Sequence, residues 1–87
     1  MNNTIYAIVN TYDDFIDSAA VATDGGAFYS LDKAKARLKE YVKSIWGFKL
    51  GEDEINACFD SNELVWEYTD DDGSTSTIEI HKIEIMD

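Results

Sequence analysis

The segment Ser30–Trp46 constrains the fold most, because its residue pattern predicts a single amphipathic helix. Its apolar residues recur at spacings of three and four: Leu31, Ala34, Leu38, Tyr41, Val42, Ile45 and Trp46. This spacing places them on one stripe of the helix, with the basic residues on the opposite arc. Ser30 is a typical N-cap residue, and Gly47 follows as a stop. An apolar stripe needs a second layer to cover it, so we expect the helix to pack across a sheet.

Segments rich in β-branched and aromatic residues flank this helix on both sides and predict strands. They are Thr4–Tyr12 and Ile16–Thr23 before the helix, and Glu63–Thr69 and Thr75–Met86 after it. Ala27–Tyr29 either continues the second strand after a bulge or adds a short strand of its own. Glu52–Phe59 forms either a short second helix or a loop. The order predicts one α+β domain over residues 1–87, a four-stranded antiparallel sheet in ββαββ order with the main helix across one face.

The period of two along a strand predicts which side chains face the helix. In the third strand, the inward set is Leu64, Trp66 and Tyr68, and the outward set is Glu63, Val65 and Glu67. Together with Trp46, the two inward aromatic residues are expected in the core. Other aromatic residues lie at the ends of elements, where an exposed ring could anchor an interface. They are Tyr12, Phe15, Tyr29 and Phe48.

The last strand changes phase along its length. Ile78 and Ile80 share one face, whereas Ile83 and Ile85 share the other. A bulge near His81–Lys82 would return all four isoleucines to the same face, and we expect one there. Asp70-Asp71-Asp72-Gly73 precedes this strand and predicts a hairpin turn, with the glycine at the position of positive φ.

Charge is distributed unevenly along the chain. Eighteen acidic and seven basic residues give a net charge of −11, beyond the roughly 2–8 that keeps a small domain soluble. Six of the seven basic residues lie within residues 32–49, so the sheet and its turns are expected to be strongly acidic. Such a charge repels phosphate backbones and argues against direct nucleic-acid binding. A basic protein surface is the expected partner, and solubility alone is the simpler explanation of the same charge.

The predicted partner-binding residues are acidic groups in the turns and on the outward strand faces. They are Asp13, Asp14, Asp17, Glu63, Glu67, Asp70, Asp71, Asp72 and Glu79. Side chains two residues apart on a strand are separated by about 6.6 Å. Successive phosphates of a nucleic-acid strand are separated by roughly 6–7 Å. A sheet that carries many carboxylates can therefore imitate a phosphate track.

Patterns typical of catalysis, metal binding or cofactor binding are absent from the sequence. Cys58 is the only cysteine and His81 the only histidine, whereas a structural zinc site needs about four such ligands. A Cys58–His81 catalytic pair is less expected than a thiol that packs as a small apolar group. The run of aspartates before Gly73 does not have the ligand spacing of a calcium-binding loop. We expect a protein that is not an enzyme and holds no metal or cofactor.

The single cysteine excludes an intramolecular disulfide and favours a reducing compartment. The first residues lack the basic group that opens a signal peptide. Apolar stretches all fall short of the roughly 20 residues of a membrane helix. A cytoplasmic location without a membrane partner is expected.

Residues 28–42, with the sequence FYSLDKAKARLKEYV, enter the predicted helix after a predicted β-hairpin. In this run, in size, in acidic charge and in the absence of proline, the chain resembles small acidic proteins encoded by phages and mobile elements. Their members include anti-CRISPR and anti-restriction inhibitors, several of which imitate DNA and occupy the basic groove of a nuclease. The resemblance implies a non-catalytic inhibitor of a host defence nuclease that acts in the host cytoplasm. It assigns no role to individual residues.

Two other functions stay open at this point. One is an intracellular structural or assembly module, such as a homodimer formed through a sheet edge or through exposed aromatic residues. The other is an immunity protein or antitoxin that neutralises a basic toxin, which would use the same electrostatic attraction.

Overall fold

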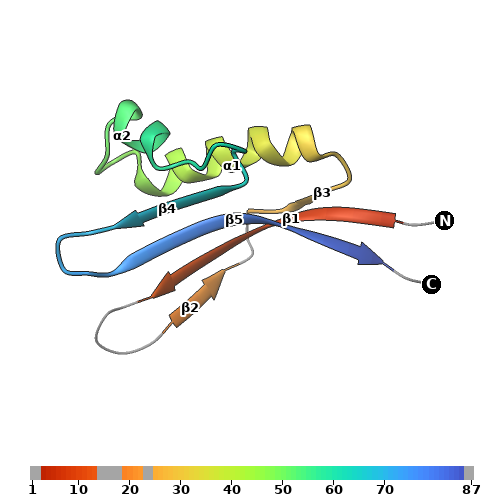
Figure 1. Ribbon diagram of the computed structural model, residues 1–87, viewed down its shortest axis with the longest axis horizontal. Helices are drawn as coiled ribbons and strands as arrows, with labels where there is room; N and C mark the ends of the chain where they lie inside the picture. The colour runs from red at the N-terminus through yellow and green to blue at the C-terminus, as the bar shows by residue number, and fades with distance from the viewer. Residues whose placement is uncertain (1–2, 14–18, 23–24, 86–87) are drawn as a thin grey trace.

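The computed structural model describes residues 3–13, 19–22 and 25–85. The elements follow in the order β1 (Asn3–Asp13), β2 (Ala19–Ala22), β3 (Ala27–Phe28), α1 (Leu31–Trp46), α2 (Glu52–Ala57), β4 (Val65–Thr69) and β5 (Thr75–Ile85). An antiparallel sheet forms one layer, and α1 and α2 form a second layer over one of its faces (Figure 1). The predicted α+β fold is confirmed, with a short second helix at Glu52–Ala57. Neither described helix has the length and apolar character that a membrane crossing requires.

The sheet is built around β1 and β5, which have eleven residues each and lie at its centre in the order β2-β1-β5-β4. They pair along their whole length, from Asn3↔Ile85 to Asp13↔Thr75. The other edge of β1 pairs with β3 at Tyr6 and Ala7 and, further along β1, with β2 at Asn10–Asp13. These two short strands supply the second strand of the predicted order, interrupted between Ala22 and Ala27.

The core lies between α1 and the sheet. The buried apolar residues are Ile8, Ala34, Leu38, Tyr41, Val42, Leu50, Ile55, Trp66 and Ile78. Trp66 is fully buried, and its indole N–H donates to the carbonyl of Ile55 at 2.8 Å, which ties α2 to β4. Trp46 and Tyr68 are partly buried beside it, with ring centroids 5.8 and 6.1 Å from that of Trp66. The three aromatic residues predicted for the core are therefore found there.

The start of α1 follows the predicted pattern. The Ser30 side chain accepts a hydrogen bond from the backbone N–H of Lys33 at 3.4 Å, and Asp32 lies in the first turn. A negative charge in the first turn is favoured by the helix dipole. These contacts fix where the helix begins, and its apolar stripe then meets the sheet.

The predicted bulge near His81–Lys82 is wrong. The register between β1 and β5 continues without interruption, so Ile83 and Ile85 face away from α1. Their residues are 43% and 42% exposed, whereas Ile78 on the helix side is buried. A bulge would interrupt a ladder of eleven paired residues. Continuous pairing of β5 with β1 is kept, although it leaves Ile83 and Ile85 on the face of the sheet that α1 does not cover.

Substitution of Gly25, which lies between β2 and β3, tests how closely this segment packs against the core. A Cβ atom at this position would lie 2.6 Å from Cγ2 of Ile8, whose side chain is fully buried. Gly25→Ala is expected to lower the free energy of unfolding by about 1–3 kcal/mol, because the core has no space for an added methyl group. Chemical denaturation measures this.

Gly51→Ala is the matched control, since a Cβ there would lie 3.9 Å from its nearest neighbour, Oε1 of Glu54. Its φ of −72° is allowed for alanine, and because Gly51 is the N-cap of α2, where glycine is preferred to alanine, we expect a smaller loss of about 0.5 kcal/mol. Equal stabilities of the two variants would contradict the close packing at Gly25.

Candidate acidic interface

Acidic residues from three segments lie at one end of the molecule, the end at which β4 passes into β5. Thr75 pairs with both Thr69 and Asp13, so the turn of residues 70–74 lies beside the end of β1. The first turn of α2 lies toward the same end (Figure 1). We call this region the acidic end; its acidic residues are Glu52, Asp53, Glu54, Glu67, Asp70, Asp71 and Asp72, and the backbone of the predicted residue Asp13 ends β1 beside the turn. The predicted residues Asp14 and Asp17 lie outside the described residues.

The turn between β4 and β5 is organised by one of its three aspartates. Oδ1 of Asp70 accepts hydrogen bonds from the backbone N–H groups of Asp72 and Ser74, both at 3.0 Å. Gly73 has a φ of 86°, as the sequence predicts for this position. Asp71 and Asp72 are exposed, and neither forms an ion pair within the described part of the chain. Asp70 therefore holds the turn, while the next two carboxylates point to solvent uncompensated.

Glu63 is not on the outward strand face, and that prediction is wrong. Its φ of 58° lies in the left-handed region, and β4 begins two residues later. Its carboxylate instead forms an ion pair with Nζ of Lys39 on α1. The hydrogen bond from Lys39, followed by the charge of that lysine, lowers the pKa of the Glu63 carboxyl. This acid thus compensates a cation of the helix and has a structural role.

A second carboxylate has a structural role in the same loop. Oδ1 of Asp60 accepts from the backbone N–H groups of Leu64 at 2.8 Å and Val65 at 3.1 Å. These bonds, above all that from Val65, lower the pKa of the Asp60 carboxyl. The Asp60 carboxylate therefore holds the loop ahead of β4 by accepting hydrogen bonds from its backbone.

The outward face of the sheet is less acidic than the sequence pattern predicts. Glu67 lies opposite Thr77 there, and Glu79 lies opposite Val65. Oε1 of Glu79 is 2.7 Å from Nε2 of His81 on the same strand face. The remaining positions of β1 and β5 on this face include Ile5, Val9 and Ile83. A row of carboxylates at the spacing of phosphates is not formed there; the acids gather at the acidic end instead.

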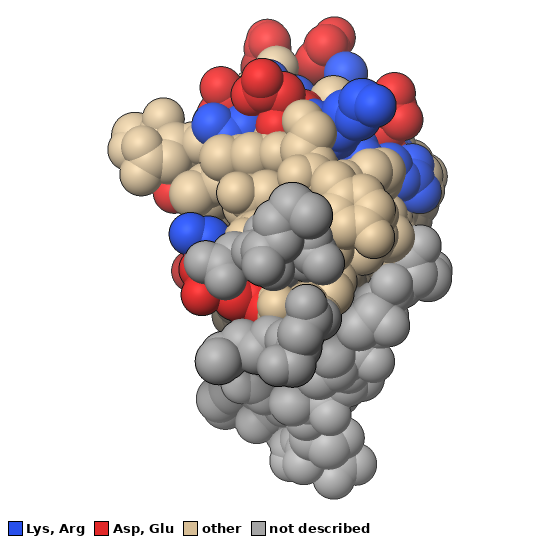
Figure 2. Space-filling model, turned by 90° about the vertical axis from the view of Figure 1, so that its right-hand side faces the viewer, with Lys and Arg blue, Asp and Glu red and all other residues tan. Residues whose placement is uncertain are grey.

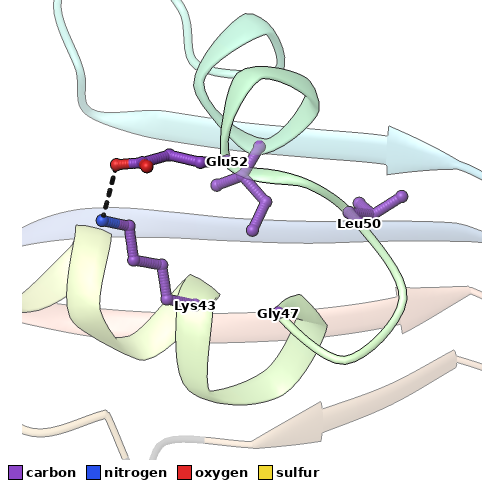
Figure 3. Close-up of a pocket in the computed structure, with 5 residues that line it drawn as sticks. Lys43, Gly47, Leu50 and Glu52 are labelled. Atoms are coloured by element: carbon purple, nitrogen blue, oxygen red, sulfur yellow. Dashed lines mark hydrogen bonds and ion pairs between the residues drawn. The ribbon is translucent and has the colours of Figure 1, made fainter.

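Two of the five cations of α1, Lys39 and Lys43, pair with acids of neighbouring segments. Besides the Lys39–Glu63 pair, Nζ of Lys43 lies 3.4 Å from Oε1 of Glu52, across a pocket of about 230 Å³ (Figure 3). Arg37 and Glu40 pair along the helix at 3.8 Å. Figure 2 shows basic and acidic side chains interspersed over the helix layer. The helix therefore presents no continuous basic stripe.

Sequence reasoning did not place α2 within the interface. Asp53 and Glu54 are exposed in its first turn. Phe48 is 86% exposed directly after α1, and the sequence marks it only as one of several aromatic residues at element ends. The sequence signal for this part of the surface is the run Glu52-Asp53-Glu54, which follows Phe48 shortly after the end of the predicted helix. That α2 lies toward the same end of the molecule as the turn of residues 70–74 depends on its contact with Trp66, which no local pattern reveals.

The groups considered for chemistry lie apart. Cys58 packs against the core on the helix side of the sheet, whereas His81 projects from the opposite face. Burial and then the charge of Glu54 raise the pKa of the Cys58 thiol, which disfavours the nucleophilic thiolate. Within residues 3–13, 19–22 and 25–85, no cluster of three or more His, Cys, Asp or Glu side chains could hold a metal ion.

The two roles of the turn aspartates can be separated by stability. Asp70→Ala is expected to lower the free energy of unfolding by about 1–2 kcal/mol, because two backbone N–H groups lose their charged acceptor. Asp71→Ala removes the same charge from the same turn and is the matched control, with an expected change near zero. Urea denaturation of both variants measures this; equal losses would show that the turn does not depend on the Asp70 side chain.

The Glu63–Lys39 ion pair predicts a pH dependence of stability. Because the pKa of Glu63 is lowered on folding, its contribution is present in full above about pH 5 and is lost as the pH falls below about 4. Glu63→Gln should therefore be less stable than the wild type near neutral pH and approach it in acid. The same substitution in a Lys39→Met background should have little effect at any pH. Urea denaturation at several pH values measures the free energies of unfolding; a difference between wild type and Glu63→Gln that does not change with pH would contradict the ion pair.

Comparison of the chain with protein-family models, with curated proteins and with solved structures gives no match.

Proposed function

We propose that the protein is a non-catalytic inhibitor whose acidic end binds a basic protein surface. The proposed target is the nucleic-acid groove of a host defence nuclease, reached in the host cytoplasm. A basic groove built for phosphates attracts carboxylates through the same long-range field. The proposed contacts are made by the acidic end, so they keep the predicted turn residues Asp70, Asp71 and Asp72 and leave out Glu63 and Glu79.

The uncompensated charge of the turn is the observation that carries this proposal. Glu52 and Glu63 pair with cations of α1, while Asp71, Asp72 and Glu67 have no ion-pair partner within the described residues. Holding like charges close together costs free energy through their mutual repulsion. Cations supplied by a partner would remove that cost, so the acidic end gains from association with a basic surface.

An exposed aromatic residue supports a protein partner. Phe48 follows the C-terminal end of α1 and is 86% exposed. Aromatic anchors surrounded by polar groups carry much of the energy of protein interfaces. An exposed phenyl ring between α1 and the acids of α2 in the chain fits a basic surface that also has an apolar hollow.

The test is a titration against purified DNA-binding nucleases, RNA-guided ones included, at low and high salt. The double variant Asp71→Asn/Asp72→Asn should weaken binding at low salt by roughly tenfold and reduce the dependence on salt. Asp32→Asn/Glu40→Gln changes the net charge equally on α1 and is the matched control, with little expected loss. Binding that is absent at low salt, indifferent to salt, or equally affected by both doubles would overturn the proposal.

Phe48→Ala separates the aromatic contribution from the electrostatic one. We expect a loss of affinity of roughly tenfold, because an interface anchor is removed, with the salt dependence left unchanged. Tyr29→Ala is the matched control, since Tyr29 is 80% exposed at the opposite end of α1. Equal effects of the two substitutions would contradict the place of the interface.

A further inference from the structure

A free strand edge lies at the end of the molecule opposite to the acidic end. β5 pairs with β1 along its whole length, but it pairs with β4 only through Thr75–Glu79. The last contact on the β4 side is the hydrogen bond from the N–H of Ile80 to the carbonyl of Leu64. Among the described residues, positions 81–85 have no strand on that side. In Figure 1, this part of β5 extends with the start of β1 toward the chain termini.

The backbone groups that face the free edge can be identified. Along a strand, successive N–H groups point to alternate sides. Since the N–H of Ile80 points toward β4, those of Lys82 and Glu84 point the same way and meet no strand there. Unpaired backbone donors and acceptors of this kind are a template for another strand.

The side chains along this edge are complementary to themselves. If a second copy pairs antiparallel about Ile83, Lys82 lies opposite the second copy's Glu84, and Glu84 lies opposite its Lys82. The two ion pairs form at the hydrogen-bonded positions, in agreement with the direction of the N–H groups. Ile83 meets Ile83 at the axis, where the side chains of a non-hydrogen-bonded pair approach closely. In the single chain Ile83 is 43% exposed, and among the described residues the ion pair of Lys82 is with Glu84 of its own strand, at 3.6 Å.

The surroundings leave space for such a neighbour. A pocket of about 230 Å³ opens on the helix side of the edge, lined by Tyr6, Leu31, Leu64, Ile80 and Lys82. The twofold axis at Ile83 is eight residues, or roughly 26 Å of strand, from Thr75 at the acidic end. The acidic ends of two copies would therefore point apart, which limits their mutual repulsion.

We propose that the protein forms a twofold dimer in which residues 81–85 of β5 pair antiparallel with the same residues of a second copy. The sheet becomes continuous across the two chains, and the occupant of the free edge is a second copy of this chain. The inference does not rest on the proposed inhibitor function, because it uses residues at the opposite end of the molecule.

A charge-swap experiment on the full chain tests this register. Lys82→Glu places like charges opposite each other in a dimer of that variant, and Glu84→Lys does the same with the opposite sign. Each variant alone should dimerise at least roughly tenfold more weakly than the wild type, since two attractive pairs become repulsive. An equimolar mixture of the two should form a heterodimer, and Lys82→Glu/Glu84→Lys should recover the homodimer. Analytical ultracentrifugation over a range of concentrations measures each state.

Amide hydrogen exchange distinguishes this dimer from dimers formed through other surfaces, because only this one protects the N–H groups of the free edge. The N–H groups of Lys82 and Glu84 should become protected as the protein concentration rises, while those of Asp71 and Asp72, at the acidic end, should not respond. Both side chains of the swapped pair are about 60% exposed (61% and 62%), and circular dichroism verifies that each variant is folded. A wild type that stays monomeric, a dimer without this protection, or a mixture that does not associate would overturn the proposal.

Discussion

The contact of one amphipathic helix with one face of a sheet determines the rest of this structure. α1 buries Leu38 and Val42 against Ile8 and Ile78, and it brings Trp46 beside Trp66. A single helix layer covers one face, so the other face of the sheet remains open to solvent. The helix layer also sets where charges meet, because the cations of α1 lie within reach of acids that follow it in sequence. Both proposals concern groups that this packing leaves without a partner.

The elements of the fold could be predicted because each is encoded by a local period. The three- and four-residue spacing of α1, the alternation around Trp66 and the turn at Gly73 all appear in the structure. The bulge in β5 was wrong for a reason that local patterns do not contain. Both phases of its isoleucines are compatible with the sequence, and the choice was made by the ladder with β1, more than sixty residues away in the chain. Register between distant strands is a property of pairing, so one strand's sequence does not determine it.

The candidate interface was predicted less completely, because net charge counts acids without showing how they are paired. Glu63 and Asp70 belong to the same acidic groups in sequence as Glu67 and Asp71. In the structure the first two are engaged, one by Lys39 and the other by backbone N–H groups, whereas the side chains of the second two have no ion-pair partner among the described residues. Positive φ at Glu63 is a tertiary outcome, since glutamate has no preference for it. Which carboxylates are bound within the protein and which can bind a partner is therefore decided by tertiary contacts, which the sequence does not show.

β5 connects the two proposed surfaces, and its length keeps them far enough apart that each can bind without the other. Its first residue, Thr75, adjoins the acidic turn, and residues 81–85 form the free edge, so a single strand of eleven residues carries a charged surface at one end and an edge able to pair at the other. A dimer through the edge would carry two acidic ends that point in opposite directions. Two such ends on one rigid particle can engage two sites, and the second contact then forms at a high effective concentration. Self-pairing at the edge would thus strengthen binding to a target that offers two basic surfaces, without any new contact at the acidic end.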